Sequence, residues 1–130
     1  MQIFSKTDRG RVRTDNQDAY FAGKITDDSV FAVVCDGMGG ANAGNVASEL
    51  AVRHISEYVI RSYRDGMDMT DTEKTLKNAI VSANISLYDK AVNNAELAGM
   101  GTTAVAVFVK DGTAVIAHVG DSRIYLVNGE

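Results

Sequence analysis

Val30-Phe-Ala-Val-Val-Cys-Asp36-Gly-Met-Gly-Gly40 joins an unbroken apolar run to an acidic residue and three glycines. The apolar run does not alternate with polar residues, which predicts a strand that is apolar on both faces. Asp36 then stands at the tip of that strand, and the glycines after it suit a loop that leads into a helix. We therefore expect a layered fold built around this strand, with a carboxylate held at one end.

The other strands are predicted from short runs of apolar and β-branched residues. Lys110-Asp-Gly112 is a hairpin signal, because glycine accepts the positive φ that a two-residue turn requires. The strands that follow residue 100 should therefore form an antiparallel meander. In all, we expect strands at residues 3–4 (Ile3 and Phe4), 19–22, 30–35, 102–109, 113–119 and 123–127.

Two helices are predicted between these groups of strands. Apolar residues recur three and four positions apart from residue 43 to about Arg64, which is the spacing of an amphipathic helix. Thr70-Asp-Thr-Glu73 matches a capping box, so a second helix should begin there and end near residue 93. Strands, two helices and further strands predict an α+β fold in which the helix pair covers one face of the sheet.

Composition and charge narrow the class of protein. The chain has 130 residues, of which 45% are hydrophobic and 23% charged, so we expect one domain with one core. No apolar run approaches the roughly 18 residues of a membrane span, and the single cysteine, Cys35, cannot form a disulfide within the chain. We expect a cytoplasmic protein without a membrane partner. The net charge of -4 and the scattered basic residues disfavour nucleic acid as a partner.

The glycine-rich loop after Asp36 does not match the common phosphate-binding loops. It has no Gly-Lys-Ser/Thr, Asn42 stands where a dinucleotide fingerprint needs its third glycine, and Ala41 stands where a cysteine-dependent phosphatase needs an arginine. Asp36 is left as a candidate ligand of Mg²⁺ or Mn²⁺, and the carbonyl oxygen of Gly37 can join it. The alternative is a carboxylate that caps the following helix or closes a turn.

Two further acidic segments lie beside predicted strands. Arg13-Thr-Asp-Asn-Gln-Asp18 places Asp18 where a loop meets a strand, and Val119-Gly-Asp121-Ser-Arg123 places Asp121 just after one. Converging carboxylates repel one another unless a divalent cation neutralises them, so these segments suit a metal site. Arg13 has the planar guanidinium that holds two phosphate oxygens. For each segment taken alone, a turn carboxylate, an ion pair across a turn or an exposed arginine without a role is the alternative.

Four segments carry a recognisable pattern: Arg13–Asp18, Val34–Gly44, Gly99-Met-Gly-Thr-Thr-Ala-Val, and Val119–Tyr125. In this order they resemble the bacterial metal-dependent PPM/PP2C protein serine/threonine phosphatases. The similarity runs from about residue 4 to residue 130 and covers only the amino-terminal part of that family's catalytic domain. The resemblance implies a four-layer α-β-β-α sandwich, of which residues 1–130 would form a partial domain with two antiparallel helices and about six strands.

The resemblance also implies roles for individual residues. Asp36 would bridge two Mn²⁺ or Mg²⁺ ions, the carbonyl of Gly37 would be a further ligand, and Asp18 would act mainly through metal-bound water. Asp121 resembles a ligand of a third, weaker metal, and Arg13 would bind the substrate phosphate. Arg13, Asp18 and Asp36 would together serve hydrolysis of phosphoserine and phosphothreonine in proteins that a serine/threonine kinase modifies.

Departures from the family pattern keep a second function class open. After Asp121 the chain has no aspartate, so two later ligands are missing and we expect residues 1–130 alone to be weak or inactive. Met38 stands where some relatives carry a histidine general acid, which leaves the proton donor unassigned. Asn128–Glu130 is a turn signal directly after a strand, which indicates a truncated chain or an edge that another chain completes.

The second function class is an inactive phosphatase-like module that dimerises or binds a partner through an open sheet edge. The candidate site residues favour the enzyme, because a purely structural module does not need them together. The unpaired edge favours the module. A metal-dependent phosphodiesterase or nuclease is a weaker third hypothesis, because the chain lacks a basic groove.

Overall fold

β2 (Ser29–Met38) contains the strand predicted at residues 30–35, and it lies between β1 and β4 in the sheet. The computed structural model describes residues 1–40 and 42–129. The strands follow the order β1-β2-β4-β5, with β3 paired to the end of β2, and neighbouring strands are antiparallel. The strands around β2 are β1 (Asp18–Thr26), β3 (Gly101–Thr102), β4 (Ala104–Lys110) and β5 (Thr113–Val119).

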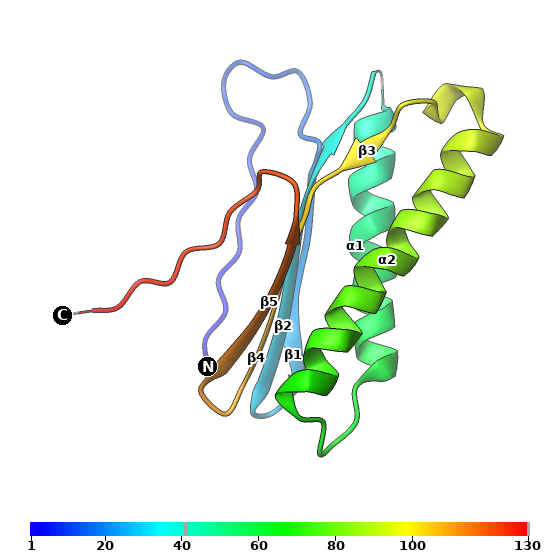
Figure 1. Ribbon diagram of the computed structural model, residues 1–130. Coiled ribbons are helices and arrows are strands. Elements are labelled where there is room, and N and C mark those ends of the chain that lie inside the picture. The colour runs from blue at the N-terminus through cyan, green and yellow to red at the C-terminus, as the bar shows by residue number, and fades with distance from the viewer. Residues whose placement is uncertain (41, 130) are drawn as a thin grey trace.

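Both long helices pack on one face of this sheet (Figure 1). They are α1 (Ala43–Ser62) and α2 (Met69–Asn93), and a short 3-10 helix, η1 (Ala95–Leu97), follows α2. Phe31, Val33 and Cys35 of β2 are 0% exposed beneath them. The apolar stripes predicted for the helices face this core and are buried: Ala47, Ala51, Ile55 and Val59 in α1, and Leu76, Ala79, Ala83 and Leu87 in α2.

The opposite face of the sheet is much more open. Val34 and Ile116 lie on it with 47% and 48% of their surfaces exposed, although Val33 and Cys35 on either side of Val34 are fully buried. The described chain therefore forms one helix layer and one sheet layer, which is half of the α-β-β-α arrangement implied by the resemblance. Neither helix in the described ranges has the length and apolarity needed to cross a membrane.

β4 and β5 form the predicted hairpin. Asp111 and Gly112 have φ values of 50° and 72°, the two positive values of a type I′ turn. Lys110 attaches this turn to the end of α1, because its ammonium group donates to the Tyr63 hydroxyl at 3.0 Å and lies 5.4 Å from the centre of the Tyr63 ring. The hairpin end of the sheet is thus fixed by contacts with the helix layer.

The helix boundaries differ from prediction at two points. Thr70–Glu73 is not the capping box of α2, because Asp68 is its N-cap and Asp71 its reciprocal partner. The amide of Asp71 donates to Asp68 Oδ1 at 2.7 Å, and the amide of Asp68 donates to Asp71 Oδ2 at 3.4 Å. Aspartate caps a helix at least as well as threonine, so the earlier box forms. At the other boundary, α1 ends at Ser62, because Tyr63 turns to an extended ψ of 135°.

Two predicted strands are wrong. Within the described residues, neither residues 3–4 nor residues 123–127 form a strand, and the sheet has five strands. Both segments are irregular chain outside the sheet (Figure 1), and Phe4 and Leu126 are 88% and 89% exposed. An extended segment becomes a strand only when a neighbour receives its backbone hydrogen bonds, and within the described residues neither segment has such a neighbour.

Candidate metal site

Asp18 and Asp36 face each other across β1 and β2 at one end of the sheet. The turn pairs Thr26 with Ser29, and an irregularity between Lys24 and Thr26 then shifts the register by one residue. Without that shift the same turn would bring Asp18 opposite residue 37. A one-residue change of register moves a side chain to the opposite face of the sheet relative to its partners. The irregularity therefore places the carboxylates of Asp18 and Asp36 side by side on the same face.

The two carboxylates interact directly. Partial burial raises the pKa of Asp18, and the Asp36 carboxylate raises it further through charge repulsion and a hydrogen bond between the side chains. Both groups lie on the open face of the sheet, where solvent and ions reach them. Their arrangement disfavours the double negative charge of this pair unless a cation or a proton is present.

Close packing fixes the end of β2 against the first turn of α1. The amide of Gly37 donates to the carbonyl of Gln17 at 3.0 Å. A Cβ atom on Gly37 would collide with the backbone carbonyl of Gly44, and one on Gly44 would collide with the side chain of Gln17. Glycine is therefore required at position 37, where the clash is with backbone, whereas a side chain at position 44 would need the end of the Gln17 side chain to move.

Arg13 lies on an exposed loop that is attached to the start of β1. Asn16 makes the attachment: its side-chain amide donates to Thr7 Oγ1 at 2.7 Å, and its Oδ1 accepts from the amide of Asp18 at 3.0 Å. In the described part of the chain, Arg13 forms no ion pair. The structure thus brings the loop of Arg13 next to Asp18 but does not join the guanidinium to either carboxylate.

Asp121 lies on the exposed turn after β5. The next residue, Ser122, has its Oγ 2.7 Å from Thr103 Oγ1, and Thr103 Oγ1 accepts from the amide of Asp36 at 3.0 Å. Residues 1–40 and 42–129 contain no group of three His, Cys, Asp or Glu side chains arranged to hold a metal. Asp121 is therefore connected to the Asp36 region through hydroxyl groups, without forming a three-carboxylate cluster with Asp18 and Asp36.

The donor set fits part of a site for a hard divalent cation. Two carboxylates on paired residues of neighbouring strands supply the oxygen ligands that Mg²⁺ and Mn²⁺ prefer, and a cation between them would remove their repulsion. The alternative that Asp36 caps a helix is wrong, because Asp36 lies within β2 and α1 has Asn42 as its N-cap. The side chain of Asn42 makes no capping hydrogen bond.

Sequence reasoning did not single out Thr103 or Gln17, although both hold the backbone of the site. Both lie within the segments that carry the family pattern, Gln17 in the first and Thr103 in the third, but no role was predicted for either. The contact between Thr103 and Asp36 joins residues 67 positions apart, which no local periodicity indicates.

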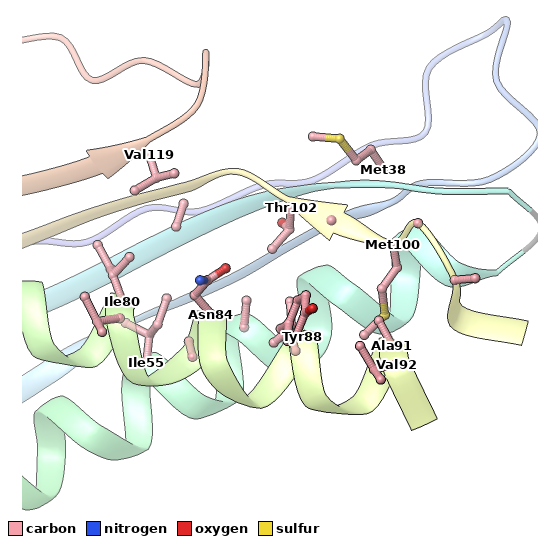
Figure 2. Close-up of a pocket in the computed structure, with 18 of the residues that line it drawn as sticks. Met38, Ile55, Ile80, Asn84, Tyr88, Ala91, Val92, Met100, Thr102 and Val119 are labelled. Atoms are coloured by element: carbon pink, nitrogen blue, oxygen red, sulfur yellow. The ribbon is translucent and has the colours of Figure 1, made fainter. Parts of the chain in front are cut away.

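A wide cavity of about 950 Å³ lies elsewhere, on the helix side of the sheet between α2 and the strand ends. Figure 2 shows Asn84 pointing from α2 toward the strands and Met100 beside Ala91. Among the described residues, no charged side chain lines this cavity, and Asn84, Tyr88 and Thr102 are its polar residues. The cavity therefore suits neither a divalent cation nor a phosphate group, and the carboxylate pair on the opposite face is the better candidate site.

The fold and the carboxylate pair define a class of α+β proteins that carry an acidic site at the end of a central strand. The profile of the family described as "Protein phosphatase 2C" matches residues 7–130, and the chain belongs to this family.

The chain is 39% identical over 122 residues to the serine/threonine phosphatase stp of Listeria monocytogenes, covering 94% of this chain and 48% of that protein. It matches the structure of the serine/threonine phosphatase Stp1 from Staphylococcus aureus with a TM-score of 0.84 at 38% identity, over 95% of this chain and 48% of that one. The catalytic domain of the serine/threonine protein phosphatase PstP, in complex with 2 manganese ions, matches with a TM-score of 0.75 at 31% identity, over 91% and 47%. The chain spans about half the length of these relatives.

Proposed function

We propose that residues 1–130 are the amino-terminal portion of a PP2C-type domain that hydrolyses phosphoserine and phosphothreonine in proteins. The observation that carries the proposal is the Asp18–Asp36 pair at the end of the central strand. The substrates would be phosphoproteins, the products of a serine/threonine kinase. The setting would be the cytoplasm, which suits a chain whose only cysteine, Cys35, is a buried free thiol.

Asp36 and Asp18 would hold two Mn²⁺ or Mg²⁺ ions, with the carbonyl oxygen of Gly37 as a further ligand and Asp121 at a third, weaker site. The support is chemical, because these groups offer hard oxygens and, among the described residues, neither Asp18 nor Asp36 forms an ion pair with a basic side chain. When bound, the ions would supply Lewis-acid activation of a water molecule and neutralise charge on the phosphoryl group.

Arg13 would bind and orient the phosphate. Its guanidinium can donate to two phosphoryl oxygens at once, and it is exposed on a loop braced against Asp18 through Asn16. This would direct the phosphorus toward the carboxylate pair. Met38, which is 55% exposed at the end of β2, has no proton to give, so the proton for the leaving group would come from another source.

The test is hydrolysis of an aryl phosphate and of a phosphothreonine peptide, in Mn²⁺ or in EDTA. The 130-residue chain would be compared with the same chain joined to the carboxyl-terminal half of the Listeria relative. We expect Mn²⁺-dependent turnover in the joined protein and little or none in the 130-residue chain, because two aspartate ligands of the family pattern are missing from the latter. A joined protein that folds but does not turn over either substrate would overturn the proposal.

The second candidate function is partner binding through an open edge. It is favoured by the last residues described, where Tyr125, Leu126 and Val127 are 73%, 89% and 86% exposed. An exposed apolar segment of this kind could become extended and add as a strand to the sheet of a second copy. Light scattering over a range of concentrations tests this function: a dimer that Leu126→Lys converts to a monomer would support it, and a monomer throughout would contradict it.

A further inference from the structure

Thr103 interrupts the regular pairing of the sheet next to Asp36. The register of β2 with β3 and β4 places Thr103 opposite Asp36, since Gly37 pairs with Thr102 and Val34 with Val105. The amide of Thr103 donates to the carbonyl of Asp36 at 2.9 Å, as in a normal ladder. In the other direction, however, the amide of Asp36 donates to the hydroxyl of Thr103, at 3.0 Å. Both backbone groups of Asp36 are thus bonded to Thr103.

The hydroxyl of Thr103 also reaches the turn that carries Asp121. Its Oγ1 lies 2.7 Å from Ser122 Oγ. A hydroxyl has one proton and two acceptor positions, so Thr103 can accept from Asp36 and donate to Ser122 at the same time. Because Thr103 is only 4% exposed, water does not readily replace these bonds.

The turn itself is shaped to fit Thr103. Gly120 has a φ of +98°, a conformation that other residues rarely adopt, and a Cβ atom at Gly120 would lie 2.7 Å from Thr103 Cγ2. The hydroxyl and the methyl group of Thr103 therefore both contact the Gly120–Ser122 turn. Asp18, Asp36, Thr103 and Gly120 form one row across the end of the sheet, in neighbouring strands or the chain that continues them.

We propose that Thr103 is a positioning residue, whose hydroxyl holds the backbone of Asp36 and the Asp121 turn at a fixed separation and so sets the affinity of both carboxylate regions for divalent cations. This inference rests on the metal site of the proposed function and assigns no ligand role to Thr103 itself. Groups that orient ligands through hydrogen bonds typically change metal affinity about 10-fold to 100-fold when they are removed.

Thr103→Val and Thr103→Ser separate the hydroxyl from the shape of the side chain. Valine fills the same space but leaves the amide of Asp36 without its acceptor, whereas serine keeps the acceptor. We expect the Mn²⁺ dissociation constant to rise about 10-fold or more in Thr103→Val and to stay within about threefold in Thr103→Ser. Thr72→Val is the matched control, because Thr72 is 8% exposed and bonds only the carbonyl of Asp68, far from the site.

Mn²⁺ affinity is measured from the free-ion signal in electron paramagnetic resonance, for the 130-residue chain and for the chain joined to the Listeria half. Hydrogen exchange in EDTA gives a second readout without metal: the amide of Asp36 should exchange faster in Thr103→Val and at the parent rate in Thr103→Ser, while the amide of Val33 stays unchanged. If Thr103→Val does not fold, Ser122→Ala tests the inference instead. This variant removes the contact between Ser122 and Thr103 but leaves the amide of Asp36 bonded to Thr103. We expect that variant to weaken Mn²⁺ binding about threefold or more.

Parent and variants that bind Mn²⁺ alike would overturn the inference and leave the proposed function standing. A parent that binds no Mn²⁺ in either protein would overturn the metal site, and with it the role of Thr103 in metal affinity. Equal exchange of the Asp36 amide in parent and Thr103→Val would show that the hydroxyl does not hold Asp36, whatever the metal affinity.

Discussion

The two faces of β2 contrast in contacts and in chemistry. On the helix-covered face, Phe31, Val33 and Cys35 are fully buried in the core. On the open face, Val34 is 47% exposed and leads to Asp36, which meets Asp18. One strand thus provides the rigid support and the candidate ligand on alternate residues. The comparison teaches that substitutions on the covered face should act on stability, and those at the end of the open face on metal binding.

Asp36→Asn should abolish most of the metal binding that we assign to the open face of β2. The amide keeps the shape of the side chain but removes the negative charge, so we expect Mn²⁺ affinity to fall by at least about 100-fold, with no loss of folding. Isothermal titration with Mn²⁺ and a thermal melt in EDTA measure the two quantities separately. Asp111→Asn, in the hairpin turn at the other end of the sheet, is the control and should bind as the parent does. Unchanged affinity in Asp36→Asn would remove this residue from the ligand set.

Val33→Ala and Val34→Ala make the same change at adjacent residues on opposite faces. Val33 is 0% exposed and Val34 47%, so Val33→Ala should lower the free energy of unfolding by about 2–3 kcal/mol and Val34→Ala by less than about 1 kcal/mol. Urea denaturation of both variants measures the difference. Equal losses would mean that the open face is covered in solution by some other part of the molecule or by a second copy.

Gly37→Ala should lower both the stability of the fold and the affinity for Mn²⁺. Its new methyl group would meet the carbonyl of Gly44 and push the first turn of α1 away from β2, which should cost about 1–3 kcal/mol of stability and also weaken Mn²⁺ binding. Gly40→Ala is the matched control, because a Cβ atom there meets nothing within 4 Å, and its stability should change by less than about 0.5 kcal/mol. The close approach described for Gly37 is refuted if both variants unfold at the same urea concentration.

The smallest expected effect is the pH dependence of Asp18→Asn. The raised pKa of Asp18, from burial and from Asp36, means that the folded state holds this proton more tightly than the unfolded chain. The favourable contribution of Asp18 is therefore present below its ordinary pKa of 3.8 and is lost as pH rises through the raised value. In EDTA, Asp18→Asn should melt slightly above the parent at pH 7, and the gain should vanish below pH 3.8. A variant that melts lower at pH 7 contradicts this sign.

Local patterns were enough to predict the strand at residues 30–35, the helical stripes and the Asp111–Gly112 turn. Each depends on residues close in sequence, such as the unbroken apolar run at 30–35. Strands at residues 3–4 and 123–127 were predicted wrongly, because β-branched residues favour extended chain but pairing requires a neighbour. The capping box of α2 forms at Asp68 and not at Thr70, because the sequence offers two similar local signals and the structure uses the earlier one.

The candidate site was harder to derive from the sequence than the fold. Asp18 and Asp36 were both singled out, but the irregularity between Lys24 and Thr26 that aligns them has no sequence signal. The bonds of Thr103 to Asp36 and Ser122 join distant segments and appear only once the strands are in register. Residue types indicated which groups suit a metal, and the three-dimensional register decided which of them meet.

The most direct test of a metal site at Asp18 and Asp36 is the broadening of amide resonances when Mn²⁺ is added to the ¹⁵N-labelled chain. Manganese broadens nearby nuclei most strongly, so the first signals lost should be those of Asp18, Asp36 and Gly37. The amides of Asp111 and Gly112, at the opposite end of the sheet, should keep their intensity, and Asp36→Asn should abolish the selective loss. Uniform broadening, or loss that begins at the hairpin, would contradict the assignment of this end of the sheet as the metal site.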